Sequence, residues 1–266
     1  MAVLNCDYFS VARKGSISFS VILPVDPPPV GLDPVKYVGG PFPTIYLLHG
    51  YSGNRNNWLY NEAVMDWAAR HGYAVVMPDG TNRFYLDNED TGELYGEFIG
   101  RELVEITRSM FPLSTRREET VIAGISMGGF GAIRNGLKYA DTFGAIIGHS
   151  SALITDEVST MQPGFSNAIA SYEYYRHTFG DTGKVLGSDK DPKHLAKICL
   201  QSGLPTPRLF MACGSEDFLF TQNRDFHEYL VSIGYPHEWW VQPGIHDFDF
   251  WNRSMPASMD WLESIQ

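Results

Sequence analysis

The residues with the clearest capacity for chemistry lie in the stretch Gly124-Ile125-Ser126-Met127-Gly128, which has the pattern G-x-S-x-G. An apolar run, TVIAGI, leads into the serine, and a helical pattern follows it. In this context the serine occupies a sharp strand-to-helix turn, and the two glycines leave room for the crossing backbone. The helix that starts there points its positive dipole end at the serine, which favours an oxyanion. The pattern therefore predicts that Ser126 is a nucleophile.

A serine hydroxyl is a weak nucleophile, so an acid and a base must support it. When the nucleophile lies on such a turn, the chain order is serine, then the acid, then histidine. Asp217 follows the strand-like run RLFMACGSE and is the predicted acid, with Glu216 as its rival. Asp191 and Asp225 are more remote alternatives, and a turn or N-cap position would also suit Asp217.

The predicted base is His246, which lies between the run EWWV and the last helical pattern of the chain. That position, in a loop after the next strand, is the one that the chain order requires. His227 falls within a helical pattern and His237 at the start of a strand, so surface roles suit both better. A histidine that caps the last helix is the alternative interpretation of His246.

The oxyanion produced by attack on a carbonyl needs two backbone donors. The amide of Met127, directly after the nucleophile, is one, and the loop after an earlier strand supplies the other. The sequence LHGYSG follows the run TIYLL, so Gly50 would allow a close approach and Tyr51 would donate its amide. A tight turn without catalytic function is the alternative here. His49 is expected to be a structural histidine beneath the site.

Two other kinds of site are weaker interpretations. The run His246-Asp247-Phe248-Asp249 has metal-ligand character, but no second His or Cys cluster accompanies it. We expect no metal, and Asp247 and Asp249 instead favour the start of the last helix. The stretch GISMGGFG lacks the spacing and acidic partner of a dinucleotide loop, so no cofactor is predicted.

The elements that must position these residues alternate between strand-like and helical patterns. Such alternation predicts an α/β fold with a mostly parallel central sheet and helices on both faces, as in α/β-hydrolases. Two N-terminal runs, 3–11 and 16–25, flank Lys14-Gly15 and are expected to form an antiparallel edge hairpin. The predicted strands are 44–49, 74–77, 120–125, 145–148, 208–213 and 238–241, and the predicted helices are 57–70, 97–110, 129–139, 221–233 and 248–264.

Length and composition limit the classes of protein. The 266 residues are expected to form one domain, 1–266, of ordinary globular composition. The net charge of -11 argues against binding to nucleic acid, which requires clustered Lys and Arg. No run approaches 18 apolar residues, and the N-terminus shows no signal-peptide pattern, so we expect no membrane span and a cytoplasmic location. Cys6, Cys199 and Cys213 are widely spaced and are expected to be free thiols.

Two segments depart from the alternating pattern. Residues 24–43 are dense in Pro and Gly and are expected to be a surface connection between strands. Residues 153–204 are rich in aromatic residues and interrupt the strand–helix alternation, which is typical of an inserted cap or lid. The alternative for this second segment is an extra helical layer on the sheet. We hypothesise that aromatic residues of 153–192 line the acyl or the alcohol pocket.

Several stretches, taken together, resemble the tributyrin esterase family of the esterase D group, which includes S-formylglutathione hydrolases and feruloyl esterases. The resemblance covers the chain from about residue 44 to its end. It implies Ser126, Asp217 and His246 as the catalytic triad and the amides of Tyr51 and Met127 as the oxyanion hole. The matching stretches are LLHGYSGNRNNW (47–58), VVMPDG (75–80), VIAGISMGGFGA (121–132), CGSEDFL (213–219) and GIHDFDFW (244–251).

The resemblance also implies a function, a serine carboxylesterase that hydrolyses short-chain acyl esters through an acyl-enzyme. Acetylated or feruloylated carbohydrate esters are among the substrates it implies, and homo-oligomers are frequent in the family. The segments 24–43 and 153–204 depart from the relatives, so the acyl and alcohol preferences stay open. The alternatives are an S-formylglutathione-type thioesterase, an acyltransferase and a catalytically inactive binding protein.

Overall fold

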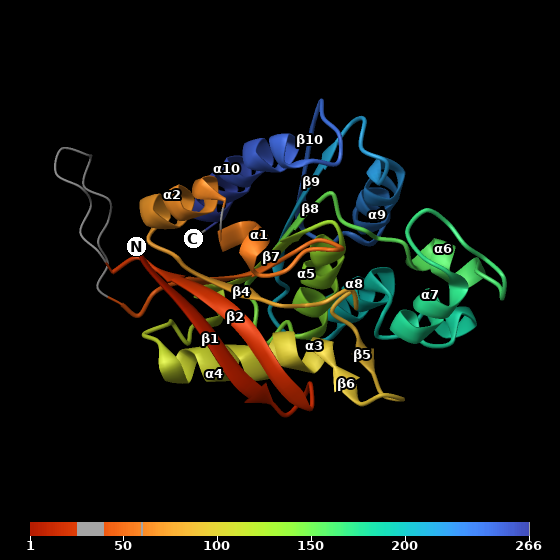
Figure 1. Cartoon of the computed structure of the whole chain (residues 1–266). Coiled ribbons are helices and arrows are strands. Elements are labelled where there is room, and N and C mark those ends of the chain that lie inside the picture. The colour runs from red at the N-terminus through yellow and green to blue at the C-terminus, as the bar shows by residue number, and fades with distance from the viewer. Residues whose placement is uncertain (26–39, 60, 266) are drawn as a thin grey trace.

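The computed structural model describes the chain except for residues 26–39, 60 and 266, so most of the predicted surface connection at 24–43 lies outside the described residues. An eight-stranded sheet forms its centre, with the strand order β1-β2-β4-β3-β7-β8-β9-β10. Helices cover both faces, and the α/β-hydrolase prediction is confirmed (Figure 1). The strands are β1 (Ala2–Ser10), β2 (Gly15–Leu23), β3 (Thr44–Leu48), β4 (Ala74–Pro78), β7 (Thr120–Ile125), β8 (Ala145–His149), β9 (Arg208–Gly214) and β10 (His237–Gln242).

The predicted N-terminal hairpin is confirmed. Strands β1 and β2 pair antiparallel, from Ala2 opposite Leu23 to Ser10 opposite Gly15. Lys14 has a φ of 52° at the turn, a left-handed conformation that lets the chain reverse. Strand β2 then pairs antiparallel with β4, so the hairpin forms one edge of the sheet (Figure 1).

The other six strands are parallel, which decides where the site lies. Strand β3 pairs with β4 and β7, β7 with β8, β8 with β9, and β9 with β10, each in parallel register. All residues of β3, β7 and β8 are buried, as expected for strands covered on both faces. Parallel strands end at a common edge of the sheet, and ligands bind there in open α/β sheets.

Alternate side chains of the strands point to two hydrophobic layers. On one face Ile45, Val121 and Ile147 pack with residues of α2 (Glu62–His71) and α10 (Phe248–Ser264). On the other face Tyr46 and Ile122 pack with residues of four helices. These helices are α4 (Leu103–Met110), α5 (Met127–Lys138), α8 (Pro192–Gln201) and α9 (Phe220–Ile233). The site at the strand ends thus rests on a sheet held from both sides.

The bounds of two predicted helices were wrong. The single helix expected over 57–70 is divided into α1 (Asn56–Leu59) and α2, because the Asn61 side chain accepts the Ala63 amide and starts a new helix. The helix expected over 97–110 begins earlier, with α3 (Tyr95–Glu97) and a π-helical turn over Phe98–Glu102, before α4. A short hairpin of β5 (Asp87–Asn88) and β6 (Glu93–Leu94) precedes it and was not predicted.

The segment 153–204 contains more regular structure than its sequence indicated. It forms α6 (Thr155–Thr160), α7 (Tyr172–Phe179), a 3-10 turn over Thr182–Lys184, and α8. Helix α8 lies on the sheet side of the segment and packs against α5 and α9, as the helical-layer alternative expected. Helices α6 and α7 project away from the sheet (Figure 1). The two halves of the segment therefore have different surroundings.

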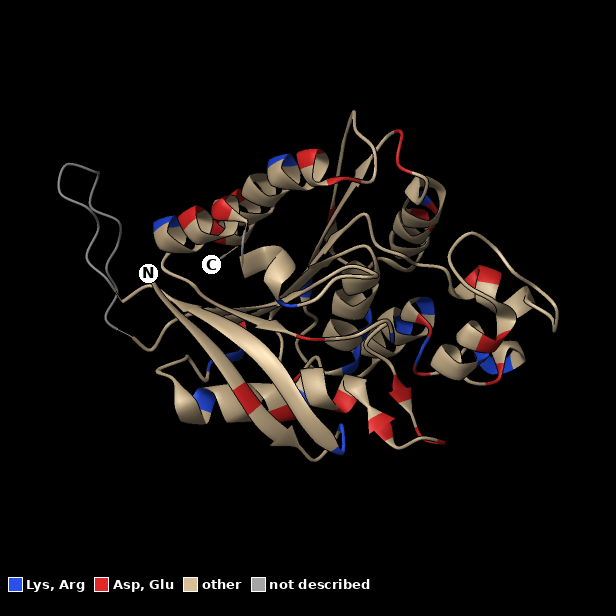
Figure 2. Cartoon of the chain, in the orientation of Figure 1, with Lys and Arg blue, Asp and Glu red and all other residues tan. Residues whose placement is uncertain are grey.

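Charged residues are distributed over the helices of the described chain, with Lys and Arg interspersed among Asp and Glu (Figure 2). Arg134 on α5 is fully buried and pairs with Asp189 at 2.6 Å and with Asp87 at 3.5 Å. Among the described residues, no helix is long and apolar enough to cross a membrane.

Candidate active site

Ser126 lies at the sharp turn between β7 and α5, as its sequence context predicts. Its backbone has a φ of 54° and a ψ of −119°, a conformation that is strained for a residue with a side chain. The Ser126 amide donates to the carbonyl of His149 at 2.9 Å, and the Ser126 carbonyl accepts from Ala152 at 2.9 Å. The loop after β8 therefore holds the strained residue in place.

Close backbone crossings explain the two glycines that flank the turn. A Cβ atom on Gly124 would lie 2.3 Å from the carbonyl oxygen of Gly128. A Cβ atom on Gly128 would lie 2.4 Å from the carbonyl oxygen of Leu48, at the end of β3. Because backbone atoms cannot move aside as the end of a flexible side chain can, the turn excludes larger residues at both positions.

The structure brings the three predicted triad residues together. Nε2 of His246 lies 2.9 Å from Oγ of Ser126, and Nδ1 of His246 lies 2.9 Å and 3.0 Å from the two carboxylate oxygens of Asp217. An ionised carboxylate only accepts hydrogen bonds, so Nδ1 carries the proton and Nε2 accepts from the serine hydroxyl. In this tautomer His246 can remove the proton of Ser126.

Asp217 is kept in its charged form by hydrogen bonds. Burial by itself would raise the pKa of this carboxyl group, whose residue is 5% exposed. The hydrogen bonds from His246 and from the Leu219 amide, the latter at 2.8 Å, outweigh burial and hold the pKa below its usual value. A charged Asp217 can therefore orient His246 and stabilise the imidazolium that forms when His246 takes a proton.

The rival acids lie elsewhere. Glu216 is exposed and accepts from the Gly244 amide at 2.6 Å, which ties down the loop before His246. Asp191 caps α8 through the Lys193 amide. Asp225 is paired with its neighbour Arg224 on the surface of α9.

The rival histidines also lie away from the serine. His227 and His237 contact each other, with 2.7 Å between Nδ1 of the first and Nε2 of the second. The ring of His227 also stacks on Trp239, so both histidines belong to a partly exposed cluster at the β10 edge.

The two predicted oxyanion donors are located at the ends of β3 and β7. Met127 is the first residue of α5, so helix geometry leaves its amide without an intrahelical acceptor. Tyr51 follows β3, and His49 fixes this loop by donating from Nδ1 to the Gly50 carbonyl at 2.8 Å and accepting from the Gly80 amide at 2.8 Å. Burial lowers the pKa of His49, which keeps the ring neutral for this structural function.

Sequence reasoning missed a layer of residues that supports the triad. Ser150, at the end of β8, is fully buried and has a φ of 46°. Its hydroxyl accepts from Nε1 of Trp251 at 3.1 Å, and Ser150 helps to lower the pKa of Asp217. The ring of Trp251 meets the His246 ring edge-on, with 5.1 Å between the ring centroids. Phe218, which is 68% exposed, makes the other ring contact of His246, with 4.5 Å between the centroids. The positive φ of Ser150 is not visible in a sequence, so nothing in the chain indicated this layer.

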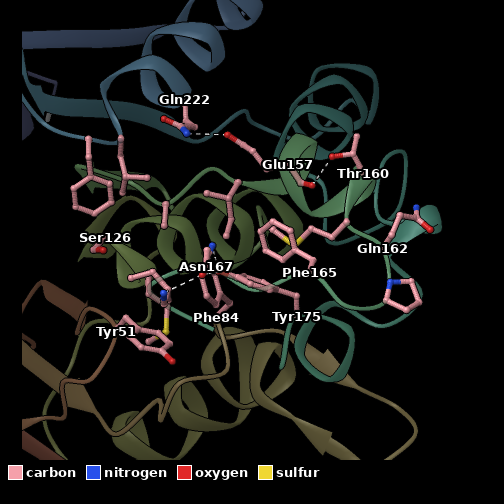
Figure 3. Close-up of a pocket in the computed structure, with 18 residues that line it drawn as sticks. Tyr51, Phe84, Ser126, Glu157, Thr160, Gln162, Phe165, Asn167, Tyr175 and Gln222 are labelled. Atoms are coloured by element: carbon pink, nitrogen blue, oxygen red, sulfur yellow. Dashed lines mark hydrogen bonds between the residues drawn. The ribbon is translucent and has the colours of Figure 1, made fainter. Parts of the chain in front are cut away.

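A mostly apolar pocket of about 770 Å³ opens beside Ser126. Figure 3 shows Ser126 at one end and Gln162 at the other, with the rings of Phe165 and Tyr175 between them. Residues 154–169 supply much of its wall, and from the aromatic segment Phe165 and Tyr175 contribute their rings. Its charged member is Glu157, which accepts from Gln222 at 2.8 Å. The pocket suits an apolar group attached to the carbonyl carbon that Ser126 would attack.

A second, smaller crevice of about 220 Å³ lies on the other side of Ser126. The loop after β3, from Gly50 to Gly53, forms one wall, and His246, Phe248 and Trp251 form the other. Ser126 and Tyr51 border both the crevice and the larger pocket. A substrate carbonyl at Ser126 would therefore have space on two sides.

Asp247, one of the candidate metal ligands, has a structural role. Asp247 accepts from the Phe250 amide at 2.9 Å and caps α10, as its sequence position indicated. Within the described ranges, no group of three His, Cys, Asp or Glu side chains is placed to hold a metal ion. The three cysteines are free thiols, and burial raises the pKa of Cys213 to about 12.

Comparison with known proteins places the chain among esterases. Residues 14–262 match the family model described as "Putative esterase". The chain is 41% identical to the acetyl esterase of Caldicellulosiruptor saccharolyticus over 266 residues, which cover 100% of this chain and 99% of that protein.

Solved structures with a similar fold include two hydrolases. The chain is similar to substrate-bound FphF, a fluorophosphonate-binding serine hydrolase of Staphylococcus aureus, with a TM-score of 0.82 and 26% identity. It is similar to the S-formylglutathione hydrolase FrmB of Staphylococcus aureus, with a TM-score of 0.80 and 27% identity. In both cases the match covers 98% of each chain.

Proposed function

The chain belongs to this esterase family and is a carboxylic-ester hydrolase, and we propose that it hydrolyses short-chain acyl esters, acetyl esters among them, with Ser126, His246 and Asp217 as its triad. The observation that carries this proposal is the continuous hydrogen-bond chain from the Ser126 hydroxyl through His246 to Asp217. The full-length likeness to an acetyl esterase supports the choice of acyl group.

The first half of the reaction forms an acyl-enzyme. Nε2 of His246 takes the proton of Ser126 while Oγ attacks the ester carbonyl. The amides of Tyr51 and Met127 hold the developing oxyanion, a contribution of about 3 kcal/mol per donor. His246 then gives its proton to the leaving alcohol oxygen, the carbon–oxygen bond of the ester breaks, and Ser126 carries the acyl group.

The second half returns the enzyme to its starting state. A water molecule takes the place of the alcohol, and His246 removes its proton as it attacks the acyl carbon. The oxyanion forms in the same hole, and the Ser126 oxygen leaves with the proton from His246. Asp217 is charged throughout, because its hydrogen bonds keep its pKa low.

The pocket beside Ser126 has room for an acyl group larger than acetyl, which supports placing the acyl part of the substrate there. Met127, Ile154 and Phe165 contribute to its apolar lining. Burying a methylene group in such a lining is worth about 0.8 kcal/mol. We infer that the first part of the segment, 154–175, acts as a cap and forms much of the acyl pocket of a single domain.

Hydrolysis of 4-nitrophenyl acetate and butyrate by the wild type and by Ser126→Ala tests this function. We expect wild-type turnover of both esters and a loss of about 10⁴-fold or more in the variant. Equal rates in the two proteins would refute the proposal. Glu216→Gln is a matched control, since this exposed carboxylate adjoins the proposed acid without contacting His246.

The cellular setting is part of the same proposal. We propose a cytoplasmic enzyme, because its three cysteines are free thiols, as is usual in a reducing compartment. A homo-oligomeric state is a further prediction, and light scattering on the purified full chain tests it.

A further inference from the structure

Asn82, in the stretch after β4, joins the loop after β3 to helix α7. Oδ1 of Asn82 accepts from the Ser52 amide at 2.8 Å. The backbone carbonyl of Asn82 accepts from the hydroxyl of Tyr174, on α7, at 2.8 Å. We call these two hydrogen bonds the Asn82 bridge. The bridge connects three segments that are distant in the sequence: the residues after β3, the residues after β4, and α7.

Tyr174 also contacts the loop after β3 through its ring. The rings of Tyr51 and Tyr174 meet edge-on, with 5.9 Å between their centroids. Tyr174 is partly buried, and burial raises its pKa, so the hydroxyl keeps the proton that it donates. The next residue of α7, Tyr175, lines the apolar pocket together with Tyr51 (Figure 3). Helix α7 therefore contacts both the pocket and the loop that carries the proposed oxyanion donor.

The direction of the Tyr51 amide depends on hydrogen bonds made on both sides of this residue. The Tyr51 amide belongs to the same planar peptide group as the Gly50 carbonyl, so holding that carbonyl fixes the direction of the N–H bond. The Gly50 carbonyl accepts from Nδ1 of His49 at 2.8 Å. The Ser52 amide belongs to the next peptide group, and Asn82 holds it. Each peptide group that adjoins Tyr51 is thus held by a side chain.

Ser52 depends on the Asn82 bridge because its backbone is left-handed. A φ of 64° is unusual for a residue with a side chain and persists only where surrounding contacts hold it. Ser52 is exposed, so packing gives it little support, and its bond to Asn82 is what restrains it. Without that bond Ser52 can relax to an ordinary conformation, and the Tyr51 amide before it can turn.

We propose that Asn82 and Tyr174 are positioning residues that keep the Tyr51 amide directed at the oxyanion. Neither of them lines the pocket or the crevice beside Ser126, so they act through the loop. The loop lies against the nucleophile, since a Cβ atom on Gly50 would be 3.5 Å from Cβ of Ser126. Removing an oxyanion donor costs about 100-fold or more in kcat, so a donor that turns away costs part of that. The inference rests on the proposed function, because it requires an oxyanion at Ser126.

Two variants remove the bridge one bond at a time. Asn82→Ala removes the acceptor of the Ser52 amide and keeps the backbone carbonyl that Tyr174 uses. Tyr174→Phe removes the hydroxyl and keeps the ring that contacts Tyr51. Neither substitution changes a group that lines the pocket, so substrate binding in the ground state should be preserved.

Each variant has a matched control away from the site. Asn5→Ala also removes an amide oxygen that accepts one hydrogen bond, here from Ser20 at 2.6 Å, in the hairpin of β1 and β2. Tyr229→Phe also removes the hydroxyl of a partly buried tyrosine, here on α9 and outside both cavities beside Ser126. A general effect of losing an amide or a hydroxyl would appear in these controls as well.

The measurements separate positioning of the oxyanion donor from a purely structural role. They are kcat and KM for 4-nitrophenyl butyrate, and inhibition by 1,1,1-trifluoroheptan-2-one and by heptan-2-one. With the trifluoro ketone, Oγ of Ser126 bonds to the carbonyl carbon, the serine proton passes to His246, and the carbonyl oxygen becomes an oxyanion. Heptan-2-one has the same chain and a far less electrophilic carbonyl, so it reports on binding without the oxyanion.

We expect Asn82→Ala to lower kcat by about 10- to 100-fold and Tyr174→Phe by about 3- to 10-fold, with KM within about 2-fold of wild type. The inhibition constant of the trifluoro ketone should rise by a similar factor in each variant, and that of heptan-2-one should not change. The double variant should lose about as much as Asn82→Ala alone, because both substitutions act on the same loop. Both controls should match the wild type.

Unchanged kcat in the folded variants would overturn the proposal, as would an equal rise in the inhibition constants of the two ketones. Circular dichroism melts show whether each variant folds. If Asn82→Ala does not fold, the more conservative Tyr174→Phe decides by the same criteria. Wild-type turnover that is lost in Ser126→Ala would leave the proposed esterase function intact in each of these cases.

Discussion

Nε1 of Trp251 donates a hydrogen bond of 3.1 Å to the hydroxyl of Ser150, and Ser150 helps to lower the pKa of Asp217. Trp251 also meets the ring of His246, so one side chain supports two members of the triad. Ser150 is fully buried and has a left-handed backbone conformation. This conformation costs about 1–3 kcal/mol and persists only where surrounding contacts require it. The arrangement indicates that this pair positions Asp217.

The first prediction concerns this pair. Ser150→Ala removes a donor to Asp217, so the pKa of Asp217 should rise and kcat/KM should fall by about 10- to 100-fold, the effect of one hydrogen bond to a charged group. Trp251→Phe keeps the ring against His246 and loses only the N–H group, so a smaller loss is expected. Kinetics with 4-nitrophenyl acetate and a circular dichroism melt of each variant measure both effects. Full activity in a folded Ser150→Ala variant would contradict the positioning role.

The second prediction concerns the backbone crossing at the nucleophile turn. Gly128→Ala places a Cβ 2.4 Å from the Leu48 carbonyl and 2.6 Å from the His49 carbonyl, so the end of β3 must shift. We expect a destabilisation of about 1–3 kcal/mol and a loss of activity of about 100-fold, because the same loop carries the Tyr51 amide. Urea unfolding and ester hydrolysis measure the two.

Gly183→Ala is the control for that substitution. Its Cβ would meet its nearest neighbour, an Asp181 oxygen, at 3.6 Å, an ordinary contact. Stability within about 0.5 kcal/mol of wild type is expected there. Equal effects of the two alanines would show that the crossing does not constrain position 128.

The third prediction concerns acyl length. Ile154→Trp adds bulk to the apolar pocket near Ser126, so octanoyl esters should lose about 10-fold or more in kcat/KM while acetyl esters change by less than about 3-fold. The measurement is a series of 4-nitrophenyl esters from acetyl to octanoyl. Leu186→Trp, at an exposed position that does not line the pocket, is the control. A uniform loss across the series would indicate that the acyl group does not lie in this pocket.

The fourth prediction concerns pH and stability. Burial lowers the pKa of His149 to about 3, whereas the pKa of a histidine in the unfolded chain is about 6.5. Between these values the unfolded chain binds a proton that the folded chain does not. The contribution of neutral His149 to stability is therefore complete above about pH 6.5 and declines as the pH falls toward 3.

His149→Gln removes this titration and keeps a polar side chain beside Ser254, with which His149 bonds at 2.8 Å. Between pH 7 and pH 5 the free energy of unfolding of the wild type should fall by about 2 kcal/mol more than that of the variant. Urea unfolding at pH 7, 6 and 5 gives this difference. Parallel pH dependence of the two proteins would show that His149 is not buried in its neutral form.

The triad could be located from the sequence because the strands that precede its residues, β7, β9 and β10, have the same order in the chain and in the sheet. Each of Ser126, Asp217 and His246 follows a strand of the parallel part of the sheet, and parallel strands end at one edge. Local sequence patterns were therefore enough to predict that these three distant residues lie close together in the fold. The alternation of apolar runs with helical periodicity was enough to give the fold class.

Other features depend on contacts between distant residues without a periodic signal. The bond between Trp251 and Ser150 joins residues 101 positions apart, and neither residue type indicates it. The hydrogen bond from Asn61 to Asn252 joins residues 191 positions apart. The division of the helix at Asn61 did have a local signal, since Asn followed by Glu62 is a good helix start, but the apolar spacing across 57–70 obscured it.

The most direct test of the triad is to find the residue that a fluorophosphonate probe phosphonylates. Intact-mass and peptide mass spectrometry after treatment with a fluorophosphonate should find one label per chain, on Ser126. His246→Ala should slow the labelling by about 10³-fold or more, since the hydroxyl then lacks its base. Labelling of another residue, or unchanged labelling of Ser126 without His246, would contradict the account.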